Sequence, residues 1–96
     1  MHVRFEEDAE ADIDEIEDYY VNNVSTKISE RILLSLFTTI EQLESFPFLG
    51  KEGSVAGTRE LQMTKYPYVV IYSVPDKYHV DIERVLHTSM QYPPEE

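Results

Sequence analysis

Two segments of the chain decide its fold: GTREL at residues 57–61 and YPYVVIY at residues 66–72. The first starts at a glycine, which predicts a strand entered from a tight turn. The second is apolar at nearly every position, as expected for a central strand. A turn at the Pro-Asp pair, residues 75–76, leads into a last strand, whose apolar phase shifts between Ile82 and Val85 and so predicts a β-bulge. The expected strands are 58–65, 68–74 and 78–87.

The N-terminal half predicts a short strand and two helices. Residues 2–6 alternate apolar and polar side chains, which favours a strand. Two runs of apolar residues at helical spacing follow, and Ser25 between them is a suitable N-cap for the second. The first run is Ala9, Ile13, Ile16 and Tyr20, and the second is Ile28, Ile32, Leu36, Ile40 and Leu43. We therefore expect an α+β fold of order β-α-α-β-β-β, a helical hairpin packed on a small antiparallel sheet, with residues 1–96 as a single domain and a frayed tail at 92–96.

The chain is strongly acidic, and its charge is unevenly spread. The formal net charge is −11, and residues 1–48 hold twelve acidic and three basic residues against seven and five in residues 49–96. Such a field repels nucleic acid, which is attracted by clustered Lys and Arg. We therefore expect no direct nucleic-acid binding. Without cysteine, a secretory leader or an apolar run of membrane-spanning length, the sequence favours the cytoplasm and no membrane association.

Residue spacing argues against a metal site. His79 and His87 lie on one predicted strand, about 26 Å apart at 3.3 Å per residue. Asp8, Asp12 and Asp14 lack the spacing and the turn glycine of a calcium loop, so a solvated acidic helix face is the better interpretation. We expect neither metal nor cofactor.

His87 and Arg59 are the candidates for chemistry. An imidazole near a strand end could move a proton, but a hydrogen bond that secures the strand end is the favoured role for His87. Arg59 could hold a phosphate or carboxylate, or equally tie the glycine-rich loop to a nearby acid. The tyrosines at positions 66, 68, 72 and 78 could stack on bases, although packing in the core and on the sheet is the favoured interpretation.

In order and spacing, these motifs resemble the RelE/ParE superfamily of small bacterial toxins, and most closely its ParE branch. The resemblance rests on Ala11-Asp12 with Ile16, Leu43 to Pro47 with Gly50, the segments 57–61 and 66–72, and Val85-Leu86-His87. It implies a toxin of a type II toxin–antitoxin operon that is neutralised by a small DNA-binding antitoxin. ParE-like members poison DNA gyrase, whereas RelE-like members cut mRNA on the ribosome. The target-binding residues that we expect are Arg59, Lys65, Arg84, His87, Met90 and Tyr92.

The acidity of the chain favours a gyrase-binding inhibitor, which is not an enzyme, over a ribosome-dependent endonuclease. A nuclease of this type needs several cationic or acid–base groups around one phosphate, and the C-terminal half offers few. Position 90 departs from the family pattern, because the resemblance implies an arginine where this chain has Met90. A third hypothesis is therefore an attenuated member that acts mainly as an antitoxin-binding module.

Overall fold

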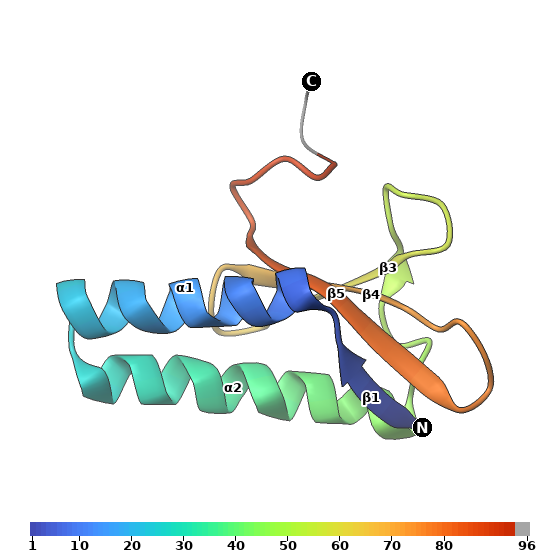
Figure 1. Cartoon of the computed structure of the whole chain (residues 1–96), viewed down its shortest axis with the longest axis horizontal. Helices are drawn as coiled ribbons and strands as arrows, with labels where there is room; N and C mark the ends of the chain where they lie inside the picture. The colour runs from blue at the N-terminus through green and yellow to red at the C-terminus, as the bar shows by residue number, and fades with distance from the viewer. Residues whose placement is uncertain (94–96) are drawn as a thin grey trace.

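The computed structural model describes residues 1–93, in which two antiparallel helices cover one face of a five-stranded sheet (Figure 1). The elements are β1 (His2–Phe5), α1 (Glu7–Asn23), α2 (Thr26–Ser45), β2 (Lys51–Glu52), β3 (Arg59–Gln62), β4 (Tyr68–Ser73) and β5 (His79–His87). The α+β class, the helical hairpin and the β3-β4-β5 meander are confirmed. A frayed tail was expected at 92–96, and residues 94–96 of it lie outside the described residues.

The sheet differs in three details from the expected one. Its order is β1-β5-β4-β3-β2, and β1 runs parallel to β5, with His2 opposite His79 and Phe5 opposite Ile82. The sheet is therefore mixed and not wholly antiparallel. The two-residue strand β2 was not predicted, because a pair of charged residues carries no strand pattern. It pairs antiparallel with β3, which ends at Gln62 and not at Lys65.

The helices form where the apolar spacing predicts them. The Ser25 hydroxyl accepts a hydrogen bond from the Ile28 amide at 3.1 Å, so the expected N-cap is confirmed. The apolar stripe of α2 is buried against the sheet, and Leu36 and Leu43 are almost completely inaccessible. None of the helices in residues 1–93 has the length and hydropathy that crossing a membrane requires.

A β-bulge in β5 keeps the core continuous. Ile71 lies opposite Arg84 and Tyr72 opposite Ile82, so Glu83 is an extra residue on β5. Ile82 and Val85 consequently both reach the core, although they are three residues apart. The predicted phase shift is confirmed at this position.

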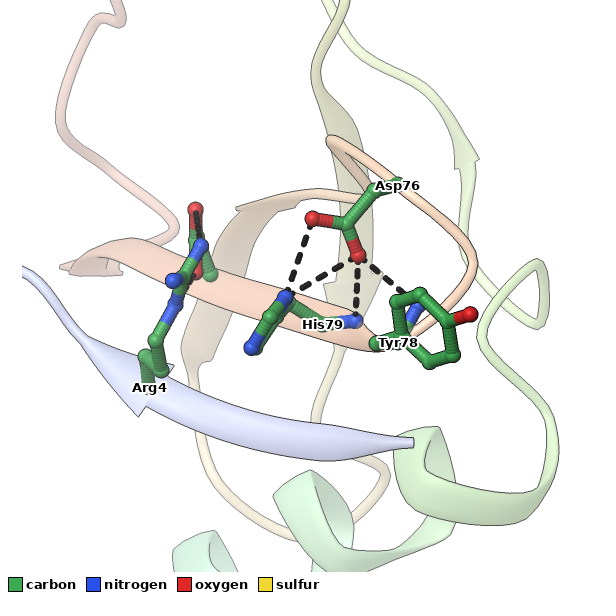
Figure 2. A network of polar contacts seen from close by, with 5 residues as sticks. Arg4, Asp76, Tyr78 and His79 are labelled. Carbon is green, nitrogen blue, oxygen red and sulfur yellow. Dashed lines mark hydrogen bonds and ion pairs between the residues drawn. The ribbon is translucent and has the colours of Figure 1, made fainter.

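The turn before β5 is organised by one carboxylate, that of Asp76 (Figure 2). Its Oδ1 accepts hydrogen bonds from the backbone N–H of Tyr78 at 2.7 Å and of His79 at 2.9 Å, and the carboxylate contacts His79 Nδ1 at 3.0 Å. These contacts lower the pKa of Asp76 below its usual value, and the hydrogen bond with the His79 side chain has the largest effect. The ion pair between Arg4 and Asp81 lies next to this turn and joins β1 to β5.

Because the folded state lowers the pKa of Asp76, the ionised carboxylate stabilises the fold above the ordinary aspartate pKa. This contribution disappears as the pH falls through the lowered pKa. Asp76→Asn keeps an acceptor for the backbone but removes the charge. We expect the wild type to be the more stable at pH 5–7, and the difference in unfolding free energy to shrink as the pH falls below the ordinary aspartate pKa and through the lowered one. Urea titrations of both proteins at several pH values measure this difference. A difference that is constant from pH 7 to pH 3 would contradict a stabilising role for the ionised Asp76 carboxylate.

Candidate functional site at the end of β5

A cleft of about 500 Å³ lies between α1 and the C-terminal end of β5. Side chains from both helix and sheet line it, which places it where the helical hairpin meets the last strand. Aromatic and polar groups dominate its wall, including Glu15, Tyr19, Tyr20, Tyr68 and His87, and the apolar Met90 also lines it. A cleft of this size and composition is a typical place for binding.

Its floor is an ion pair between Asp12 of α1 and Arg84 of β5. Arg84 donates from Nε to Asp12 Oδ2 at 2.8 Å and from Nη2 to Oδ1 at 2.9 Å, and the backbone N–H of Val85 donates to the same Oδ2 at 2.9 Å. The hydrogen bonds with Asp12 raise the pKa of Arg84 above its usual value. Since two of its donors bind one carboxylate, the guanidinium mainly fixes α1 on the sheet.

His87 is held by the turn that follows β5. The backbone N–H of Ser89 donates to His87 Nδ1 at 3.1 Å, and the Ser89 hydroxyl lies 2.7 Å from the same nitrogen. An N–H group can only donate, so Nδ1 is the acceptor and the neutral ring carries its proton on Nε2. In this tautomer Nε2 is a hydrogen-bond donor and not a general base.

Three tyrosines form the aromatic side of the cleft. The Tyr68 hydroxyl is hydrogen-bonded to that of Tyr20 at 3.1 Å, and burial together with this bond raises the pKa of Tyr68. The rings of Tyr19 and Tyr20 pack edge to face at 5.0 Å, and those of Tyr68 and His87 at 5.4 Å. Packing is thus the role of Tyr68, as expected. Tyr78, by contrast, is 61% exposed in the turn before β5, with the Lys77 ammonium over its ring, so the expectation of packing was wrong there.

Arg59 lies outside this cleft. Its Nε and Nη2 donate to the carbonyl oxygen of Gly50 at 3.0 and 2.6 Å, Nη2 also donates to the carbonyl of Phe48 at 3.2 Å, and the guanidinium lies 5.3 Å from the Phe48 ring centroid. Arg59 therefore holds the loop before β2 in place, which was one of the two roles expected for it. It does so through backbone carbonyl groups and not through an acid. In the sheet it is opposite Tyr72, about 13 Å along the strands from the Tyr68–His87 pair.

The six residues expected to bind a target divide between several places. Arg84, His87 and Met90 meet at the cleft, where Met90 is 57% exposed. Lys65 is exposed in the β3–β4 turn, and Tyr92 lines a second cavity of about 260 Å³ on the sheet face away from the helices. The sequence reasoning missed Asp12, Tyr19 and Tyr20. A signal for Asp12 was available, since a polar residue at its position interrupts the apolar stripe between Ala9 and Ile16.

The comparisons with known proteins agree with this fold. A solved structure, "Chromosomal ParDE TA system from P. aeruginosa", superposes with a TM-score of 0.81 at 22% identity, over 91% of this chain and 95% of that one. A curated relative, "Putative toxin Y4kP" of Sinorhizobium fredii (strain NBRC 101917 / NGR234), is 28% identical over 74 residues, which are 77% of this chain and 75% of the relative. Residues 3–92 match the family described as "ParE toxin of type II toxin-antitoxin system, parDE". The chain belongs to the ParE toxin family.

Proposed function

We propose that this protein is a toxin that a cognate antitoxin neutralises and that inhibits DNA gyrase by binding to it, without catalysing a reaction. The family match over residues 3–92 is the observation that carries the proposal. The antitoxin is expected to be a small DNA-binding protein. A net charge of −11 also supports a protein target, because it opposes direct binding to nucleic acid.

The arrangement of the cationic side chains supports binding over catalysis. Cleavage of a phosphodiester requires cations and a proton-transfer group around the reacting phosphate. Arg84 is paired with Asp12, and Arg59 is bound to loop carbonyls in another part of the molecule. His87 presents a donor at Nε2 in its neutral form. These groups do not form a phosphate site.

The direct test is a supercoiling assay. Purified protein should inhibit gyrase-dependent supercoiling of relaxed plasmid, and addition of the cognate antitoxin should restore it. The control is the same gyrase without toxin. Undiminished supercoiling at a large molar excess of folded protein would refute gyrase as the target.

His87→Gln distinguishes the proposal from a ribosome-dependent endonuclease. Glutamine retains an N–H donor but has no titratable ring, so we expect inhibition of gyrase to remain within about threefold of the wild type. Loss of a general acid or base would lower the rate of cleavage by about 10²–10⁴-fold. Cleavage of ribosome-bound mRNA by the wild type, lost in folded His87→Gln, would favour the endonuclease.

An attenuated toxin is the second candidate, and Met90 is the residue that favours it. Its side chain is exposed at the rim of the cleft, where a longer cationic side chain has room. We expect Met90→Arg to inhibit gyrase more strongly than the wild type, by about threefold, because an exposed ion pair with the target contributes about 0.2–1 kcal/mol. Dose–response curves of supercoiling measure the change. Growth arrest on expression of Met90→Arg but not of the wild type would show that the natural protein is attenuated.

A further inference from the structure

The cleft at the end of β5 combines aromatic rings with an unneutralised negative charge. Of its three tyrosines, Tyr68 is buried, Tyr20 is half-buried and Tyr19 is 53% exposed, so the aromatic wall is accessible from outside. The edge-to-face packing of Tyr19 on Tyr20 and the hydrogen bond between Tyr20 and Tyr68 hold the three rings together. The wall is therefore formed before any ligand arrives.

The charge of the cleft resides on Glu15. Asp12 and Arg84 bind each other through two hydrogen bonds and cancel as a pair. Within residues 1–93, Glu15 forms no ion pair, and it is exposed beside the rings. The residues that line the cleft thus leave one net negative charge, on a helix that is itself rich in acids.

We propose that this cleft accepts an arginine side chain of a protein partner. Aromatic faces attract a cation through their negative quadrupole, and a carboxylate next to them adds a charge-assisted hydrogen bond. A guanidinium suits both, because it is planar, weakly hydrated and able to bind a carboxylate with two donors. The negative charge disfavours phosphate groups. The inference rests on the proposed function only in taking the partner to be a protein.

The test uses short peptides and needs neither gyrase nor antitoxin. Acetyl-Gly-Arg-Gly-amide is titrated into the protein, and its binding is followed by the NMR signals of the tyrosine rings. Two comparison peptides replace the arginine, one with citrulline, its neutral isostere, and the other with leucine. We expect the arginine peptide to shift the ring signals of Tyr19, Tyr20 and Tyr68, and to bind about three to ten times more tightly than the citrulline peptide. Equal affinity for the three peptides, a preference for leucine, or no shift of these rings would overturn the proposal.

Variants on the surface locate the effect. Glu15→Gln and Tyr19→Leu should each weaken binding of the arginine peptide by about threefold or more. The matched controls are Glu17→Gln and Tyr78→Leu. Glu17 lies about 200° around α1 from Glu15, and Tyr78 lies about 30 Å from His87, at the other end of β5. Both control variants should bind the arginine peptide like the wild type. If the controls weaken binding as much as Glu15→Gln and Tyr19→Leu, the cleft is not the site. Peptide binding together with failed gyrase inhibition would refute only the proposed target.

Discussion

Replacing Asp12 with alanine should lower the free energy of unfolding by about 2–4 kcal/mol, and the Tm by roughly 10–25 °C. The Asp12 side chain is 9% exposed and accepts three hydrogen bonds, two from Arg84 and one from the backbone of Val85. Its removal leaves a guanidinium without its partner and a buried N–H without an acceptor. Because Arg84 is 28% exposed, water solvates it in part, and we expect less than the full cost of a buried orphan charge.

Two further substitutions separate these contributions. Asp12→Asn retains an oxygen for the Val85 amide but loses the charge, so it should cost about half as much as alanine. Asp14→Ala removes an exposed acid from the same helix and should change stability by no more than about 0.5 kcal/mol. Urea unfolding of the three variants measures the series. Similar stabilities for Asp12→Ala and Asp14→Ala would mean that the carboxylate does not hold α1 on the sheet.

Gly50→Ala should destabilise the protein by about 2–4 kcal/mol, because there is no space for a methyl group at this position. An ideal Cβ would lie 2.7 Å from the carbonyl oxygen of Glu60 and 2.8 Å from the hydroxyl of Tyr72. The Glu60 carbonyl belongs to β3, which the sheet fixes. The Gly50 amide also donates to the Tyr72 hydroxyl at 2.9 Å, so the loop cannot move away without losing that bond.

Gly57→Ala is the informative comparison, since it tests backbone conformation without a clash. Gly57 has φ of +83°, and a Cβ there would meet nothing within 4 Å. The left-handed conformation alone should cost about 1–2 kcal/mol. Thermal unfolding should therefore rank Gly50→Ala below Gly57→Ala in stability; the reverse order would show that the loop around Gly50 relaxes easily.

Local patterns in the sequence predicted most of the fold. Apolar spacing located both helices, Ser25 marked the start of the second, and the phase shift between Ile82 and Val85 located the bulge. The neighbour of β1 was not predictable in this way, because five alternating residues fit either edge of a sheet in either direction. The extent of β3 was missed for a similar reason: alternation continues to Lys65, whereas pairing stops at Gln62.

The candidate site was less predictable, because the relevant pairs are far apart along the chain. His87 and Arg84 were singled out, but Arg84 meets Asp12 across 72 positions, and Tyr68 meets Tyr20 across 48. The sequence left open whether Arg59 has a partner within the protein, and it indicated none for Arg84. Only the packing of the loop and of α1 shows that Arg59 and Arg84 each have partners within the protein.

The pairing of β1 with β5 has a consequence for synthesis on the ribosome. Strand β1 emerges long before its sheet neighbour, which lies at residues 79–82. Residues 2–5 must therefore wait, unpaired, while more than seventy further residues are translated. The sheet closes only once β5 has left the exit tunnel, so the cleft at the end of that strand cannot form before then.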